Sequence, residues 1–219
     1  MTGTTGLPPG AVPWLHETAR TIARHLYRPV YRVRVEGADR VPRTGPVVLV
    51  ANHSTLIEPQ LIFGMLPRRS VFLVKDELFT GPVGAALRRI GQVPVRRGEP
   101  DRTALRIATG VLRDGGVVAV FPEGTRGAGD VASAQRGAAW LVRTTGAVVL
   151  PVAVRGTLRA RGTRAPGTRW PARTRVDVHV GEPFALDVGP GRAGLDEATE
   201  RLRSGLAELV AAVDRRRGD

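Results

Sequence analysis

The stretch VANHSTLIEP, residues 50–59, places a histidine and a carboxylate five residues apart at the end of an apolar run. A neutral imidazole can take a proton from an alcohol, and a carboxylate on its other nitrogen fixes the tautomer and stabilises the imidazolium. General-base catalysis of this kind typically contributes ~10²–10⁴-fold in rate. Because the sequence has no GxSxG motif to supply a serine nucleophile, we expect His53 and Glu58 to activate the hydroxyl of a substrate.

The spacing of these two residues also has a purely structural interpretation. In a regular helix five residues turn the chain by about 500°, which points the two side chains about 140° apart. They can meet if residues 53–58 form a turn and the helix begins afterwards, with Pro59 at its favoured first position. The alternative is a capping box of Thr55 and Glu58. It would put Pro59 at the fourth helical position, where a hydrogen bond is lost, so the sequence favours the pair.

A second polar cluster, FPEGTR, follows another apolar run. Gly124 allows close approach of the backbone to a ligand. Thr125 and Arg126 offer a hydroxyl and a planar cation, which suit a phosphate or a carboxylate. The alternative interpretation is a surface turn in which Glu123 pairs with Arg126.

Lysine is used at one position in a chain with 33 basic residues. Lys75 follows the apolar run SVFLV, where either chance or a need for a compact ammonium would account for it.

Five motifs, taken in order, resemble those of the glycerolipid acyltransferases, whose central member is lysophosphatidic acid acyltransferase. They are NHSTLIE, VKDELF, GQVPVRRG, FPEGTR and VLPVAVRG, and the resemblance covers roughly residues 30–185. It implies transfer of a fatty acyl group from acyl-CoA or acyl-carrier protein to the free hydroxyl of a lysophospholipid. The expected acceptor is 1-acylglycerol-3-phosphate, the product is phosphatidic acid, and no metal or further cofactor is needed.

The resemblance also implies residue roles. His53 would be the general base and Glu58 its orienting carboxylate. The acceptor-binding residues would be Lys75, Arg97, Glu123, Gly124, Thr125 and Arg126, and Pro151 would lie in a block linked with the acyl donor. The sequence departs from the family pattern His-x4-Asp at Glu58, whose extra methylene moves the carboxylate by ~1.5 Å. It also departs at Arg96 and at the Ala-Gln pair 134–135.

Two other functions stay open. One is the same acyl transfer to another acceptor, such as a lipid amino acid, a glycolipid or a specialised metabolite. The other is a non-catalytic lipid- or nucleic-acid-binding module, in which Glu58 in place of aspartate prevents the pair from acting as a general base. Nucleic acid is disfavoured, because the chain has no recognisable nucleic-acid-binding motif and only 5% aromatic residues for base stacking.

Alternating strand-like and helical segments must position these clusters. Apolar or two-periodic runs predict strands at 30–37, 45–52, 70–75, 92–97, 117–124, 147–156 and 174–184. Helical patterns fall at 58–66, 81–91, 101–116, 133–146 and 194–217, and the basic stretch 158–175 is a predicted loop. This alternation predicts an α/β fold with a single, mostly parallel sheet flanked by helices. Ligands bind beyond the carboxyl ends of such strands, where the polar clusters lie.

An amphipathic helix is predicted from Trp14 to Tyr31, with a row formed by Arg20, Arg24 and Arg28. It could pack on the domain, which the sequence slightly favours, or lie in a lipid headgroup layer. We therefore expect residues 1–32 to be a flexible tail and amphipathic helix, and residues 33–219 to be the acyltransferase domain.

The net charge of +13 fits either an arginine-rich genome or an anionic partner. The absence of cysteine suits a reducing compartment. With no recognisable signal peptide or membrane-spanning run, we expect a cytoplasmic protein that is peripheral on the inner face of the cell membrane.

Overall fold

Within the described residues (6–29, 31–96, 101–123, 129–158 and 174–218 of the computed structural model), seven strands form one sheet of order β1-β7-β6-β2-β5-β3-β4. The strands are β1 (Tyr31–Glu36), β2 (Val47–Ala51), β3 (Ser70–Lys75), β4 (Val93–Val95), β5 (Val117–Val120), β6 (Val148–Arg155) and β7 (Thr174–Val180). The helices are α1 (Pro13–Leu26), α2 (Ile57–Met65), α3 (Gly81–Arg89), α4 (Arg102–Arg113), α5 (Gly137–Thr145) and α6 (Gly191–Gly218), with short 3-10 turns η1 (Ala38–Arg40) and η2 (Asp76–Leu78).

Five neighbouring strands of the sheet run parallel, namely β6, β2, β5, β3 and β4. Strand β7 pairs antiparallel with β6, and β1 pairs parallel with β7, so these two strands at one end of the sheet run against the rest. The prediction of a single, mostly parallel sheet is therefore confirmed. The carboxyl ends of β2, β5, β3 and β4 share one edge, which brings together polar clusters that are far apart in sequence.

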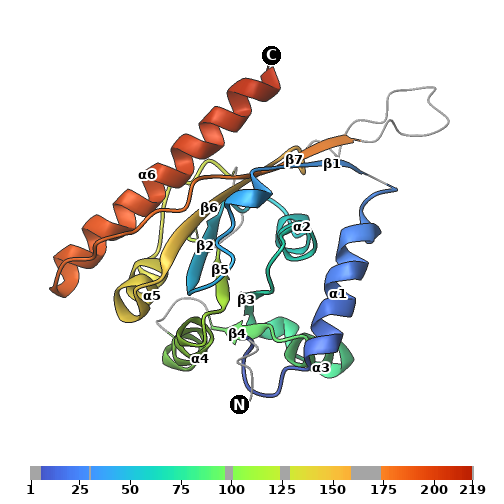
Figure 1. Ribbon diagram of the computed structural model, residues 1–219, viewed down its shortest axis with the longest axis horizontal. Helices are drawn as coiled ribbons and strands as arrows, with labels where there is room; N and C mark the ends of the chain where they lie inside the picture. Colours follow the sequence, from blue (N-terminus) through green and yellow to red (C-terminus); the bar gives the residue numbers. More distant parts are fainter. Residues whose placement is uncertain (1–5, 30, 97–100, 124–128, 159–173, 219) are drawn as a thin grey trace.

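Helices cover both faces of the sheet (Figure 1). Strand β2 is buried at all five positions, as its continuous apolar sequence predicts for a parallel strand covered on both sides. Val48 and Val50 point into a core that includes residues of α4, α5 and α6. Val47, Leu49 and Ala51 point the other way, into a core shared with α2 and α1. Strand β2, which leads directly to Asn52 and His53, thus packs between two apolar layers.

Helix α1 packs on the domain through its arginine row. Arg20 is buried and donates from Nε to the Phe63 carbonyl (3.2 Å) and from Nη2 to the Leu66 carbonyl. Arg24 donates from Nε to the Gly64 carbonyl at 3.0 Å. These oxygens lie at the C-terminal end of α2, where a helix leaves its carbonyls without intrahelical partners. Arg20 and Arg24, which could have met lipid phosphates, instead cap a neighbouring helix.

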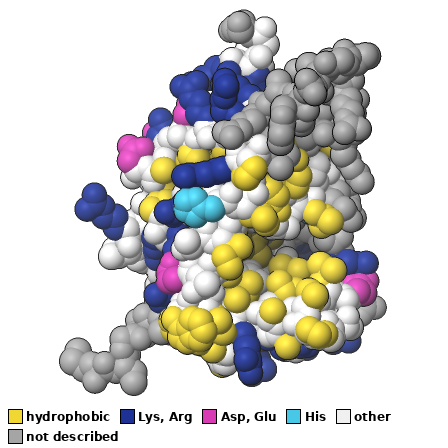
Figure 2. Space-filling model, turned by 90° about the vertical axis from the view of Figure 1, so that its right-hand side faces the viewer, with side chains coloured by type: hydrophobic (Ala, Val, Ile, Leu, Met, Phe, Trp, Pro, Cys, Tyr) yellow, Lys and Arg dark blue, Asp and Glu magenta, His cyan; other side chains and the backbone are white. Residues whose placement is uncertain are grey.

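The outward face of α1 exposes large apolar side chains among polar ones. Trp14, Ile22 and Leu26 are 67%, 59% and 56% exposed. Figure 2 views this side of the molecule. It shows hydrophobic side chains gathered on this side, with Lys and Arg side chains at the margins of the group. The helix is shorter than the predicted segment because Pro29 disfavours helical geometry at the residue before it.

Candidate active site

Asn52 is the first residue beyond β2 and ties that strand to its neighbour. Its Nδ2 donates to the Val154 carbonyl at 3.0 Å, and its Oδ1 accepts the Val154 N–H at 2.8 Å. Both residues are buried. The side-chain amide therefore takes the place of a backbone hydrogen-bonding partner between β2 and β6. It fixes the point at which the next residue, His53, leaves the sheet.

His53 and Glu58 meet in the interior. His53 Nδ1 lies 3.1 Å from Glu58 Oε2, and the two residues are 6% and 0% exposed. A carboxylate only accepts hydrogen bonds, so in the neutral imidazole the hydrogen is assigned to Nδ1 and Nε2 carries the lone pair. Among the described residues no side chain or backbone group hydrogen-bonds Nε2. The imidazole is thus oriented as a base whose accepting nitrogen is not engaged by the described part of the chain.

The local backbone combines both interpretations of the His53–Glu58 spacing. Residues 53–56 form the turn that the pair requires, but α2 begins at Ile57. The predicted helix start after Glu58 is therefore wrong by two residues, and Pro59 occupies the third helical position. No intrahelical bond is lost there, because the first four N–H groups of a helix have no intrahelical acceptor.

Glu58 also performs half of a capping box. Its Oε2 accepts the backbone N–H groups of Ser54 (2.7 Å) and Thr55 (2.8 Å) as well as His53 Nδ1–H. Its Oε1 accepts the hydroxyl of Thr157 at 2.7 Å. Four donors thus surround a fully buried carboxylate in the first turn of α2, where the helix dipole also favours negative charge.

Phe121, at the end of β5, packs against the imidazole. The two rings are stacked, with centroids 4.3 Å apart and planes inclined by 26°. Phe121 in turn stacks on Phe72 of β3 at 6.0 Å. The aromatic residue that opens the FPEGTR motif therefore limits rotation of the His53 side chain.

Glu123 supports the histidine from the same loop. Its Oε1 accepts the backbone N–H of His53 at 2.8 Å. Burial raises the pKa of the Glu123 carboxyl, the His53 N–H opposes that shift, and the nearby negative charge of Asp130 adds to it. This contact orients the backbone of the base.

The other predicted binding residues are only partly described. Lys75 ends β3 at the same carboxyl edge as His53, with β5 between the two strands. Its side chain is 45% exposed and its ammonium pairs with Glu77 at 2.5 Å. Pro151 lies in β6 opposite Val50. Arg97, Gly124, Thr125 and Arg126 lie outside the described residues, as does most of the predicted loop 158–175.

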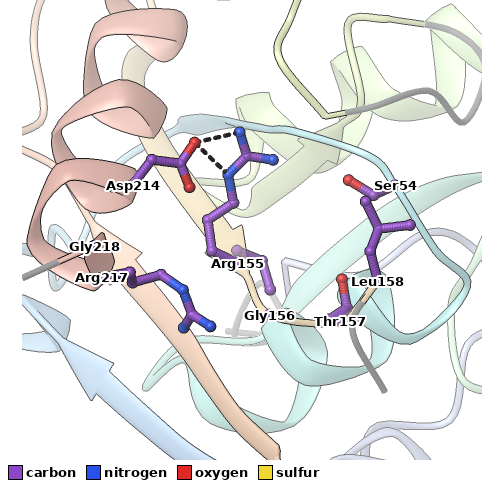
Figure 3. A pocket seen from close by; sticks show the side chains of 9 residues that line it. Ser54, Arg155, Gly156, Thr157, Leu158, Asp214, Arg217 and Gly218 are labelled. Atoms are coloured by element: carbon purple, nitrogen blue, oxygen red, sulfur yellow. Dashed lines mark hydrogen bonds and ion pairs between the residues drawn. The ribbon is translucent and has the colours of Figure 1, made fainter. Parts of the chain in front are cut away.

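A cavity of about 320 Å³ lies beside the Glu58 carboxylate, between the end of β6 and the end of α6. Ser54 and Thr157, two of the donors to Glu58, also line it. Figure 3 shows Arg155 reaching across to Asp214 of α6, with Arg217 beside them. The positive charges of the two arginines are balanced by Asp214 and Asp177.

Sequence reasoning missed Asn52 and Thr157 as members of the site. Thr157 lies 99 residues from Glu58, so no spacing pattern links them. A usable signal was its place two residues beyond the buried strand β6, because polar residues after parallel strands gather at one edge.

Among the described residues there is no cluster of three or more histidine or acidic side chains that could hold a metal ion. Within the same residues, no helix combines the length and apolarity needed to cross a bilayer.

The chain is similar to known acyltransferases. The family model described as Acyltransferase matches residues 32–155. The chloroplastic 1-acyl-sn-glycerol-3-phosphate acyltransferase LPAT1 of Arabidopsis thaliana is 30% identical over 75% of this chain and 47% of its own length. The 1-acyl-sn-glycerol-3-phosphate acyltransferase of Bacillus subtilis is 27% identical over 83% of this chain and 90% of its own length. The chain thus spans about half of the plant relative and most of the bacterial one.

A solved structure has the same fold. The crystal structure of the 1-acyl-sn-glycerophosphate (LPA) acyltransferase PlsC from Thermotoga maritima matches with a TM-score of 0.64 and 25% sequence identity. The match covers 89% of this chain and 79% of that one.

Proposed function

Because this chain belongs to the acyltransferase family, we propose that it transfers a fatty acyl group from an acyl thioester to the free hydroxyl of 1-acylglycerol-3-phosphate. The product would be phosphatidic acid. The observation that carries the proposal is the buried His53–Glu58 pair, whose Nε2 is not hydrogen-bonded by any described residue. It lies where a parallel sheet binds its ligands. The proposed reaction uses no metal and no cofactor besides the acyl-CoA or acyl-carrier-protein donor.

In this mechanism His53 Nε2 accepts the proton of the acceptor hydroxyl as its oxygen attacks the thioester carbonyl. Glu58 keeps the other ring hydrogen on Nδ1 and stabilises the imidazolium that forms. The C–S bond then breaks, and the imidazolium returns its proton to the leaving thiolate. A new ester and a free thiol result, and His53 is again neutral.

The acceptor phosphate would be bound by basic residues at the same edge of the sheet. Lys75 is partly exposed there, and its ammonium contacts only one exposed carboxylate among the described residues, that of Glu77. Arg97, Gly124, Thr125 and Arg126 enter the proposal from the sequence alone. A guanidinium suits a phosphate because its planar N–H groups match two phosphate oxygens.

We also propose that the protein works at the inner face of the cell membrane, docked through the outward face of α1. Two observations support this surface. Trp14, Ile22 and Leu26 expose an apolar row, and the net charge of +13 favours an anionic lipid surface. Each basic residue near such a surface contributes about 1 kcal/mol.

The first test is acyl transfer from a labelled fatty acyl-CoA to 1-acylglycerol-3-phosphate on vesicles. Parent protein should form phosphatidic acid, and His53→Ala should reduce the rate by ~10²-fold or more. His179→Ala is the matched control, because His179 is also nearly buried and also contacts a carboxylate, Glu36 at 3.2 Å, but belongs to β7, which runs antiparallel to β6. This control should retain transfer.

Other outcomes would change the proposal in distinct ways. Transfer only from acyl-carrier protein would assign the donor. Transfer only to another alcohol or amine would replace the acceptor and keep the chemistry. Full activity of His53→Ala would overturn the general-base mechanism, and inactivity of folded parent with every donor and acceptor would overturn the enzyme.

A further inference from the structure

We propose that Thr157 is a positioning residue, which fixes the rotation of the Glu58 carboxylate so that Oε2 faces His53. This inference rests on the proposed function, because it assigns Thr157 to the same general-base pair. Thr157 Oγ1 donates to Glu58 Oε1 at 2.7 Å, and the two residues are 2% and 0% exposed. The contact therefore joins two buried side chains.

The argument turns on the last torsion of the glutamate side chain. Rotation about this bond in Glu is broad and has no sharp staggered minima. Oε2 accepts from three donors, and any freedom of the carboxylate plane would weaken the alignment with His53 Nδ1–H. Among the contacts that Glu58 makes with described residues, the Thr157 hydroxyl is the one that holds Oε1. Because both oxygens are then held by separate donors, the carboxylate plane is fixed.

The backbone around Thr157 is shaped for this contact. Gly156 has a φ of +96°, a backbone conformation that residues with a side chain rarely adopt. A Cβ at this position would lie 2.2 Å from the Arg175 carbonyl oxygen and 2.8 Å from Arg217 Nη2. Glycine at 156 thus permits a turn immediately after β6, and this turn delivers the threonine hydroxyl to the carboxylate.

A shorter carboxylate could not occupy the same position. Removing one methylene withdraws the carboxyl group by ~1.5 Å, so an aspartate at 58 would be too far from the Thr157 hydroxyl while the backbone stays in place. Thr157 and Glu58 therefore form a matched pair, and the benefit of the hydroxyl depends on the length of the glutamate.

The kinetic test replaces Thr157 by valine, which keeps the shape and removes the donor. A small misplacement of catalytic groups can cost up to ~10²-fold, so we expect Thr157→Val to lower kcat by about 10-fold to 100-fold with KM for the acceptor changed less than about twofold. Thr157→Ser keeps the donor and should restore most of the rate. Thr109→Val is the matched control, since Thr109 is also buried but bonds within α4, to the Leu105 carbonyl.

Coupling to Glu58 separates positioning from general stability. In a Glu58→Asp background, already slower than the parent, Thr157→Val should have an effect below about twofold, because the contact is absent there. An equal loss in both backgrounds would mean that Thr157 acts independently of Glu58 and would overturn the proposal. Should the valine variant fail to fold, Thr157→Ala provides the same deletion.

A third readout needs no enzymatic activity. In ¹⁵N NMR of the folded protein, His53 should show one neutral tautomer with its hydrogen on Nδ1. Thr157→Val should give a mixture of the two tautomers. An unchanged single tautomer in the variant would overturn the positioning role even if the parent transferred no acyl group, so failure of the inference and failure of the proposed function can be told apart.

Discussion

The side chain of Asn52 and the backbone of Val154 form a reciprocal pair of hydrogen bonds, one donated and one accepted, in the interior of the sheet. Asn52 lies one residue before His53, and Val154 lies three residues before Thr157. The pair of hydrogen bonds therefore joins the two chain segments that supply the base and the hydroxyl holding its carboxylate. Both segments keep their spacing only while β2 and β6 stay in register.

Replacing Asn52 by leucine tests the contribution of the Asn52–Val154 hydrogen bonds. The variant keeps a similar volume but leaves the Val154 N–H and carbonyl buried without partners, and each unpaired group costs about 1–3 kcal/mol. We expect the free energy of unfolding to fall by about 2–4 kcal/mol, measured by urea denaturation. Gln135→Leu, at an exposed side chain, should stay within about 0.5 kcal/mol of the parent. Equal stability of the two variants would contradict the bridging role.

Glu123 predicts a pH dependence of stability. Its raised pKa means that ionising this carboxyl is harder in the folded protein than in the unfolded chain. The unfolded chain therefore loses its proton first, and stability falls as pH rises from the ordinary glutamate pKa through the raised value.

The variant Glu123→Gln removes this titration and keeps an oxygen that can accept the His53 N–H. The melting temperature of the variant minus that of the parent should be more positive at pH 7 than at pH 4, as measured by scanning calorimetry across that range. A difference that does not change with pH would mean that Glu123 is not perturbed by its burial.

The apolar face of α1 predicts how vesicle binding depends on individual side chains. Full burial of one large apolar side chain is worth about 1.5–3 kcal/mol. Partial insertion of Trp14, Ile22 and Leu26 together should therefore strengthen partitioning by at least ~10-fold. Changing all three to serine should remove this gain in co-sedimentation with anionic vesicles. A Thr18→Ala, Thr21→Ala variant on the same helix should bind like the parent. Equal binding by both variants would exclude α1 as the docking surface.

The order of the elements and the parallel sheet could be predicted from sequence because strand and helix periodicities are local properties. The His53–Glu58 contact could be predicted for the same reason, since only five residues and one turn separate the partners. Thr157 could not be found this way, because its contact depends on the strand order that places β6 beside β2.

The orientation of α1 illustrates a second limit. Periodicity identifies two faces of a helix but not which face the domain needs. Arginine is ordinarily assigned to solvent, yet the carbonyls at the end of α2 need donors, and Arg20 and Arg24 supply them. The start of α2 was predicted two residues late because Pro59 is tolerated anywhere in the first turn and does not single out its first position.

Helix α2 has a further consequence, because it is held at both ends. Its first turn carries Glu58, its last turn is held by the arginines of α1, and its nine residues span about 14 Å. If α1 lies on a bilayer, α2 links the docked helix to the carboxylate that orients the imidazole. The height of His53 above the bilayer is then a constant of the fold. An acceptor would be selected by the depth at which its hydroxyl sits among the headgroups, before any contact reads its chemical identity.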